Sequence, residues 1–311
     1  MYSQHNDWQK LQPFLPEQGQ LQSEIMPHES MQTLAGFNVH LDSYLPKTPS
    51  KVTVILLHGV GGNGRLLSFL AVPLLRAGIK VICPDLPGYG YSETKRPVVY
   101  QDWINVGCEL ANQTLKDEEQ VFVFGLSTGG MLAYNIACHV PKLSGLLVTN
   151  ILDNRLQVVR DYSAKNKLQS RFGIPLLSAL PKPIQRVKLP VRWLCNMNAL
   201  VNDQNILKLL LADRRAAGGK VSLEFLLSMI AQKPLLEPED FKAMPACLLH
   251  PDEDEWTPTH ISELFFDRIA SPTNKYLLTK AGHFPIEQPG YDQLVDAMLS
   301  FVSSKQASAT I

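Results

Sequence analysis

Residues 121 to 130 of this 311-residue chain read Val-Phe-Val-Phe-Gly-Leu-Ser-Thr-Gly-Gly, and an apolar helical pattern follows them. The run of β-branched and aromatic residues predicts a buried strand, and the glycines predict a turn too sharp for larger side chains. Ser127 stands at the centre of this Gly-x-Ser-x-Gly pattern, between the strand and the helix. A serine in that setting projects its hydroxyl into the space above the sheet, which is typical of a nucleophile.

Short apolar runs alternate with helical patterns along most of the chain, which predicts an α/β fold with a mostly parallel sheet and helices on both faces. The expected strands are residues 52–57, 81–83, 121–125, 146–150, 246–249 and 275–279. The expected helices are residues 65–77, 102–115, 128–139, 261–269 and 291–302. Two leading antiparallel strands are expected near 21–27 and 37–45, and the first 15 or so residues are expected to be loosely ordered.

The alternation stops between residues 153 and 242, in a segment with several prolines. One helix there has legible ends: Asn202 or Asp203 can cap its start, and Gly218-Gly219 can end it. Its apolar face consists of Ile206, Leu207, Leu210 and Leu211. We therefore expect a core formed by residues 1–152 and 243–311, with residues 153–242 as a cap over the carboxyl ends of the strands.

A serine hydroxyl needs a histidine base, which in turn needs an orienting carboxylate, and in this architecture they follow in the order serine, acid, histidine. His283 follows a predicted strand in a short loop, whereas the alternative, His260, opens a helix. For the acid, Asp254 lies four residues before Pro258 and is favoured. Asp252 in the same acidic loop and Asp153 after the preceding strand remain alternatives.

Cleavage of an acyl bond also needs donors for the oxyanion that forms as the carbonyl becomes tetrahedral. The backbone N–H of Thr128, next after the serine, is one expected donor, and that of Val60 in the glycine-rich loop His58-Gly59-Val60-Gly61-Gly62 is the other. Residues 59–64 also satisfy Gly-x-Gly-x-x-Gly, with Asp85 about 20 residues later, which is formally a dinucleotide-binding pattern. That oxidoreductase hypothesis leaves Ser127, Asp254 and His283 unexplained.

The ordered set of motifs resembles the α/β-hydrolase superfamily. The pieces that carry the resemblance are residues 58–62, Asp85-Leu86-Pro87-Gly88-Tyr89-Gly90-Tyr91-Ser92, residues 125–130, Asp254 with Pro258, and Gly282-His283-Phe284-Pro285. The resemblance covers roughly residues 20 to 305 without the cap. It implies an eight-stranded sheet, a mainly helical cap inserted after strand six, and hydrolysis without a cofactor. One departure is Pro251, where relatives often have a glycine three residues before the acid.

Within the superfamily the sequence looks most like carboxylesterases and the monoacylglycerol lipase or lysophospholipase group, which implies a serine hydrolase of acyl esters working through Ser127, His283 and Asp254. Other hydrolytic chemistry on the same three residues, on lactones, thioesters or carbon–carbon bonds, is the alternative. A non-catalytic binding protein is less favoured, because such members usually lack part of this set.

Composition excludes several other classes of function. The 29 basic and 29 acidic residues cancel, which argues against a nucleic-acid-binding protein. There is no apolar run of spanning length and no basic, then apolar, amino-terminal signal, so a cytoplasmic location is expected. The five cysteines lack metal-ligand or disulfide spacing and are expected to be free thiols, with no metal site.

The predicted cap differs from the rest of the chain in charge. Residues 153–242 contain 15 lysines and arginines against 8 acidic residues, and between Arg155 and Arg192 Asp161 is the only acid. The apolar run from Phe172 to Leu180 lies within this basic segment. The combination suits contact with an anionic membrane surface, and a solvated cap whose apolar residues line an acyl pocket is the alternative.

Overall fold

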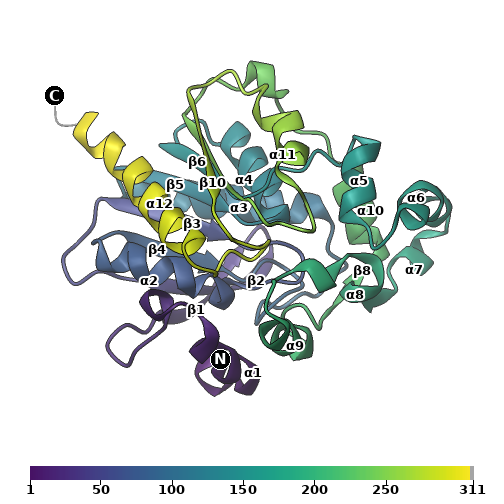
Figure 1. Cartoon of the computed structure of the whole chain (residues 1–311), viewed down its shortest axis with the longest axis horizontal. Helices are drawn as coiled ribbons and strands as arrows, with labels where there is room; N and C mark the ends of the chain where they lie inside the picture. Colours follow the sequence, from purple (N-terminus) through teal and green to yellow (C-terminus); the bar gives the residue numbers. More distant parts are fainter. Residues whose placement is uncertain (309–311) are drawn as a thin grey trace.

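The protein is described by a computed structural model covering residues 1–308, and its centre is an eight-stranded sheet (Figure 1). The strand order is β1-β2-β4-β3-β5-β6-β9-β10, with β1, β2 and β4 paired antiparallel and every later pair parallel. The bounds are β1 His28–Leu34, β2 Phe37–Tyr44, β3 Val52–Leu57, β4 Lys80–Pro84, β5 Gln120–Gly125, β6 Gly145–Val148, β9 Ala246–Pro251 and β10 Thr273–Leu278. The mostly parallel eight-stranded sheet predicted from the sequence is confirmed.

Helices cover both faces of this sheet. Their bounds are α2 Ser68–Arg76, α3 Tyr100–Asp117, α4 Thr128–His139, α11 Thr259–Phe266 and α12 Gly290–Ser308. Helices α2 and α12 contact each other on one face, and α3 and α4 contact each other on the opposite face (Figure 1). The central strands β3 and β5 are buried along almost their whole length, which explains their unbroken apolar sequences.

The first strand lies later in the chain than its sequence indicated. Residues 21–27 do not form a strand, and Gln22 and Ile25 instead close a tight turn. Strand β1 runs up to a two-residue hairpin at Ala35-Gly36, whose φ angles of 47° and 79° suit a tight turn between twisted strands. The prediction of a strand at residues 21–27 was therefore wrong. The true first strand was missed because alanine is an unusual residue at such a turn and because the strand before it is rich in polar residues.

The prediction of a loosely ordered amino-terminal segment was also wrong. Helix α1 (Asn6–Leu11) packs on the domain, and Tyr2, Trp8, Leu11 and Leu15 are all buried. The Tyr2 hydroxyl donates to the carboxylate of Asp85 at 2.9 Å, and the Arg65 guanidinium lies 4.7 Å from the centre of the Tyr2 ring. Widely spaced apolar residues anchor this segment, because each of them finds a place in the core.

Between β6 and β9 the chain leaves the sheet in an excursion that includes residues 153–242. It forms α5 Gln157–Ser163, α6 Ile174–Ser178, α7 Lys182–Gln185, α8 Val191–Leu194, α9 Gln204–Ala212, α10 Leu223–Ala231 and an antiparallel ribbon of β7 Lys188–Pro190 and β8 Lys220–Ser222. The side chain of Asp203 caps α9 as predicted. That helix ends at Ala212, not at Gly218-Gly219, because the chain turns back and the Gly218 amide donates to the carbonyl of Asp213.

Residues 1–308 contain no helix long and apolar enough to cross a membrane. The five cysteines are free, and Cys83, Cys138 and Cys247 are buried.

Candidate active site

The turn that carries Ser127 has the strained geometry expected of a nucleophile. Ser127 has φ 57° and ψ −125°, a conformation that non-glycine residues rarely adopt. A Cβ on Gly125 would overlap the carbonyl oxygen of Gly129, and one on Gly130 would overlap that of Asn150. The glycines therefore let β5, the turn and α4 pass close to one another while the hydroxyl of Ser127 stays accessible.

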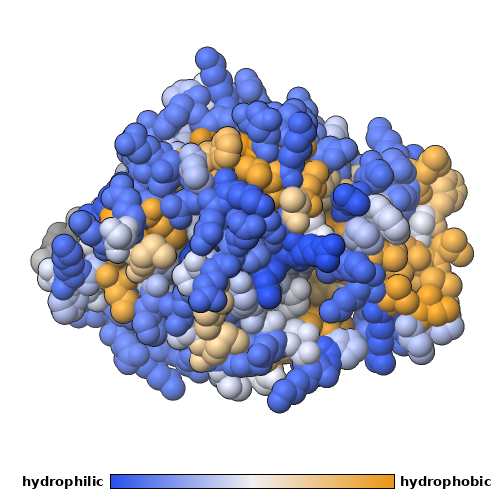
Figure 2. All heavy atoms as spheres, turned by 90° about the horizontal axis from the view of Figure 1, so that it is seen from below, coloured by the Kyte–Doolittle hydropathy of each residue, from blue (hydrophilic) through white to orange (hydrophobic). Residues whose placement is uncertain are grey.

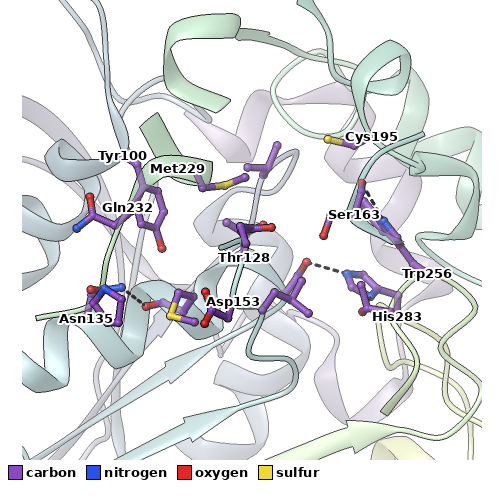
Figure 3. Close-up of a pocket in the computed structure, with 17 residues that line it drawn as sticks. Tyr100, Thr128, Asn135, Asp153, Ser163, Cys195, Met229, Gln232, Trp256 and His283 are labelled. Atoms are coloured by element: carbon purple, nitrogen blue, oxygen red, sulfur yellow. Dashed lines mark hydrogen bonds between the residues drawn. The ribbon is translucent and has the colours of Figure 1, made fainter. Parts of the chain in front are cut away.

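His283 and Asp254 meet Ser127 although the three residues are far apart in the sequence. The Ser127 Oγ–H donates to His283 Nε2 at 2.7 Å, and His283 Nδ1–H donates to Asp254 Oδ2 at 2.8 Å. The carboxyl ends of β5 and β9 and the loop after β10 supply these side chains, all at the same edge of the sheet. Figure 3 shows His283 pointing into the pocket with its ring nitrogen on the dashed line to the serine hydroxyl. The structure thus brings together the three residues predicted as catalytic.

The Asp254 carboxylate is buried and strongly hydrogen-bonded. Its Oδ1 accepts from the backbone amides of Trp256 at 2.9 Å and Thr257 at 2.8 Å, and its Oδ2 accepts from the Thr257 hydroxyl at 2.9 Å. Burial by itself raises the pKa of Asp254, but the attraction and hydrogen bond of His283 and the Thr257 amide outweigh it and lower that pKa to about 2. Asp254 is therefore ionised at neutral pH and can hold the imidazole in one tautomer.

Behind Asp254 lies a buried polar residue that no motif in the sequence indicated. Asn150 Nδ2 lies 3.0 Å from Asp254 Oδ2, 3.0 Å from the Thr257 hydroxyl and 3.1 Å from His250 Nε2. His250 Nδ1–H donates to the carbonyl of Pro251, and burial lowers the pKa of His250, so Nε2 is free to accept. An asparagine at the end of a predicted strand carries no sequence signal of this role, because its partners come from distant segments.

The loop before the acid lacks the expected glycine but is held in other ways. The amide of Asp252 donates to the carbonyl of Leu278, and that of Glu253 donates to the carbonyl of Ala281. These bonds tie the end of β9 to the loop that carries His283. Pro251 itself pairs with Leu278 as the last residue of the strand.

The loop that precedes Val60 packs against the turn that carries Thr128, whose two backbone amides are predicted to bind the oxyanion. The position of a Cβ on Gly59 is 3.1 Å from Ser127 Cβ and 3.2 Å from the Thr128 amide nitrogen, so the backbone just before Val60 packs against the nucleophile turn. The Ser127 amide is already bonded to the Thr149 hydroxyl at 3.2 Å, whereas Thr128 begins α4. The first amides of a helix carry partial positive charge and suit a developing negative charge.

The alternative acids and the alternative base bond to other partners. Asp153 lines the pocket, but its carboxylate is held by Arg155 at 2.8 Å through both oxygens. Asp252 is exposed and accepts from the amide of Lys280, and His260 is exposed on α11 beside Tyr162. None of these contacts links an alternative residue to Ser127 or His283.

The residues of the dinucleotide-like pattern have structural partners. The carboxylate of Asp85 is fully buried and accepts from the amides of Gly64 at 2.7 Å and Tyr91 at 2.8 Å, so it cannot reach a ribose hydroxyl. His58 Nδ1–H donates to the carbonyl of Gly59, and its Nε2 accepts from the Leu86 amide at 2.9 Å. Burial lowers the pKa of His58 to about 4, so it is neutral and holds the glycine-rich loop.

The pocket above Ser127 lies between the sheet edge and the cap. The core contributes Val60, Tyr100, Thr128, Met131, Asn135, Leu152, Trp256, Thr257 and His283, and the segment 153–242 contributes Asp153, Asn154, Ser163, Cys195, Met229, Gln232 and Pro234. Figure 3 shows Met229 and Cys195 facing the core residues across this space. The rings of Trp256 and His283 lie 4.7 Å apart, so the indole packs against the imidazole. Residues of the segment 153–242 thus line the pocket together with core residues around Ser127 and His283.

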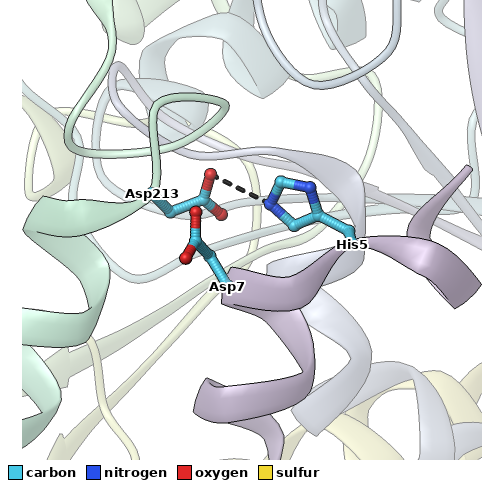
Figure 4. Close-up of side chains that lie close together, drawn as sticks. All are labelled: His5, Asp7 and Asp213. Atoms are coloured by element: carbon cyan, nitrogen blue, oxygen red, sulfur yellow. Dashed lines mark hydrogen bonds and ion pairs between the residues drawn. The ribbon is translucent and has the colours of Figure 1, made fainter.

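Within the described residues 1–308, potential metal ligands gather at two places, and neither group includes a residue that lines this pocket. His5, Asp7 and Asp213 join α1 to the turn after α9 (Figure 4). His5 Nε2 bonds Asp213 Oδ1 at 3.1 Å, and the amide of Arg215 donates to that same oxygen. The second group, Glu29, His40 and Asp42, surrounds the guanidinium of Arg65, which supplies the positive charge. Both groups therefore serve as contacts within the fold.

Comparison with known proteins agrees with this geometry. Residues 54–297 match the alpha/beta hydrolase family. The chain is 26% identical over 255 residues to a thermostable monoacylglycerol lipase from a Bacillus species, covering 80% of this chain and 90% of that protein. Among solved structures, a monoacylglycerol lipase from Paleococcus ferrophilus superposes with a TM-score of 0.71 at 21% identity, covering 86% of this chain and 99% of that one. A soluble variant of monoglyceride lipase from Saccharomyces cerevisiae superposes with a TM-score of 0.72 at 17% identity, covering 90% and 96%. The family match spans most of the chain, and the sheet, the serine turn and the order of the motifs agree with it, so this protein belongs to the alpha/beta hydrolase family.

Proposed function

We propose that this protein is a serine hydrolase that cleaves carboxylic esters of single acyl chains, with monoacylglycerols and lysophospholipids as its substrate class. The observation that carries the proposal is the continuous hydrogen-bonded series from Ser127 through His283 to the ionised Asp254. The relatives named as monoacylglycerol lipases support the ester chemistry.

The geometry supports a two-step mechanism. Ser127 Oγ attacks the ester carbonyl as His283 Nε2 takes the hydroxyl proton, and the oxyanion accepts from the amides of Val60 and Thr128. Each such donor contributes about 3 kcal/mol to transition-state stabilisation. As the tetrahedral intermediate collapses, the C–O bond to the leaving alkoxide breaks and His283 returns the proton to it. Water activated by His283 then cleaves the Ser127 ester and releases the fatty acid.

The preference for an acyl chain rests on a second cavity inside the cap. Its lining is mostly aliphatic and includes Ile174, Leu177, Leu194, Leu223, Leu226, Leu227, Met229 and Ile230. It shares Asn154, Ser163, Cys195 and Met229 with the pocket above Ser127, so the two spaces adjoin. An acyl chain bound to Ser127 has an apolar path from the triad into the cap, where burying each methylene contributes about 0.8 kcal/mol.

The test is hydrolysis of p-nitrophenyl esters from acetyl to long acyl chains, together with a monoacylglycerol, by the wild type and four variants. We expect Ser127→Ala and His283→Ala to lose activity, and Asp254→Asn to lose about 10⁴-fold in kcat. Asp153→Asn is the matched control, because Asp153 lines the pocket but contacts Arg155. Full activity of Asp254→Asn, or equal loss in Asp153→Asn, would contradict the assigned acid. A folded wild type that cleaves no ester would redirect the proposal to lactones, thioesters or carbon–carbon bonds.

A further inference from the structure

The cap carries an exposed apolar stripe that the proposed chemistry does not use. Residues 167–178 are helical, with a π-turn at Gln169–Gly173 that leads into α6. Leu168, Phe172 and Leu176 recur every fourth residue and are 71%, 71% and 68% exposed. Side chains four apart lie on one face of a helix, so these three form a continuous ridge, here called the apolar stripe. Figure 2 shows apolar atoms gathered at the end of the molecule that holds α6 and α7.

Further exposed apolar residues adjoin the stripe. Trp193 is 53% exposed, and its carbonyl accepts from the Gln169 side chain at 3.2 Å, which places it next to the helix. Exposed Ile184 and Val187 follow in α7 and just after it, where the Gln185 side chain bonds the carbonyls of Leu177 and Ser178. Large apolar groups exposed together in this way mark a surface that meets another apolar phase.

Unpaired cations flank the apolar residues in the sequence. Within residues 1–308, Lys165 and Lys167, just before Leu168, and Arg192, just before Trp193, are exposed and form no ion pair. The two acids nearest in this part of the cap are already engaged, Asp161 by Arg171 and Glu224 by Arg186. The surface around the apolar stripe therefore has an excess of positive charge, which complements an anionic layer.

The opposite face of the same helix lines the acyl cavity. Gly173, Ile174 and Leu177 border that cavity, whereas Leu168, Phe172 and Leu176 face away from it. The helix is thus apolar on both sides, and it separates the acyl cavity from the exposed stripe.

We propose that the apolar stripe, Trp193 and the flanking cations dock the cap on the surface of an anionic phospholipid bilayer, with the mouth of the acyl cavity beside the membrane. The inference builds on the proposed function, because a single-chain ester dissolved in a membrane would then enter the cavity without crossing water. Apolar side chains would insert at the level of the headgroups while Lys165, Lys167 and Arg192 contact lipid phosphates.

The experiment is co-sedimentation of the Ser127→Ala protein with phosphatidylcholine vesicles, with or without a minority of phosphatidylglycerol, at low and high salt. The inactive variant keeps the lipids intact, so the binding result does not depend on catalysis. We expect binding to the anionic vesicles at low salt, loss of that binding at high salt, and little binding to neutral vesicles. Equal sedimentation with both vesicle types would overturn the proposal.

Two sets of substitutions localise the contact on the same background. Two triple variants should each weaken vesicle binding at least about tenfold. The stripe variant combines Leu168→Gln, Phe172→Gln and Leu176→Gln, and the cation variant combines Lys165→Gln, Lys167→Gln and Arg192→Gln. The control is Leu45→Gln with Lys47→Gln, an exposed leucine and lysine just after β2, which should leave binding unchanged. Equal effects of the control and the stripe variants would refute the assignment of the surface.

Two further measurements separate membrane docking from a folding defect and from self-association. When the stripe substitutions are made in the protein that keeps Ser127, they should leave activity on a soluble short-chain ester at the wild-type level. That result would show that the cap is folded and that the loss of vesicle binding does not come from a loss of catalysis. Size-exclusion chromatography with light scattering checks for self-association. If the protein is a dimer that binds no vesicles, and the stripe substitutions dissociate that dimer, then the stripe is an interface between two copies and the membrane proposal is overturned.

Discussion

Asn150→Ala is the substitution that best tests whether the contacts behind the triad matter for catalysis. The amide of Asn150 is one of five donor groups around the Asp254 carboxylate, with His283 Nδ1, two backbone amides and the Thr257 hydroxyl. Asn150 does not line the substrate pocket. An effect on turnover would therefore act through Asp254 and the orientation of His283, or through the Thr149 hydroxyl, which donates to Asn150 Oδ1 at 2.9 Å and accepts from the Ser127 amide.

The structure sets the size of the effect. A hydrogen bond to a charged group contributes about 1.5 to 3 kcal/mol, so its loss can lower kcat by about 10- to 150-fold when the full value is realised in the transition state. The attraction and hydrogen bond of His283 and the Thr257 amide, which remain in the variant, still hold the pKa of Asp254 low, so the carboxylate stays ionised at neutral pH. The loss would therefore come from orientation, and KM should change little.

The assay measures kcat and KM on a soluble short-chain ester. A second assay measures the rate at which a fluorophosphonate labels Ser127, which reports the reactivity of the serine without a substrate. Thr114→Ala is the control, because Thr114 is also buried, does not line the pocket, and its hydroxyl donates to the Leu110 carbonyl in its own helix. We expect both rates to fall together in Asn150→Ala and the labelling rate to hold in Thr114→Ala. A folded Asn150→Ala enzyme with kcat and labelling within about twofold of wild type would refute the positioning role.

Three further changes test other parts of the structure. Burial lowers the pKa of His58 to about 4, whereas the imidazole of the unfolded chain titrates near about 6.5, so the unfolded chain binds the proton first as the pH falls. The free energy of unfolding should therefore decrease between those two pH values by up to about 1.4 kcal/mol per pH unit. Denaturant unfolding at several pH values should show a smaller decrease for His58→Asn, and an unchanged slope would contradict the role given to His58. Gly130→Ala should fail to give folded, fluorophosphonate-reactive protein, because its Cβ would overlap the Asn150 carbonyl oxygen; normal labelling would show that the turn can relax. Tyr2→Phe removes the hydrogen bond to the buried Asp85 and should lower the free energy of unfolding by about 1 to 3 kcal/mol with activity retained, whereas unchanged stability would mean that the amino-terminal segment is not anchored there.

Much of the fold could be predicted from the sequence because its signals are local. The central strands are short apolar runs, and the glycines around Ser127 are required by a turn in which any side chain would strike backbone. The failures have equally local causes. An Ala-Gly hairpin is a weak turn signal, so β1 was misplaced, and the few apolar residues between Tyr2 and Leu15 lie among many polar ones, so their burial was not predicted.

The sequence by itself determined the strand-turn-helix around Ser127, the alternation that builds a parallel sheet, and the types of residue available as base and acid. Only the tertiary structure decided which carboxylate faces His283, because Asp153, Asp252 and Asp254 all follow predicted strands and differ only in what surrounds them. It also decided the contact of Asn150 with Asp254, which joins residues 104 positions apart, and which face of the cap helix meets the acyl cavity and which meets solvent. Such choices depend on where distant segments meet, and local propensity carries no information about that.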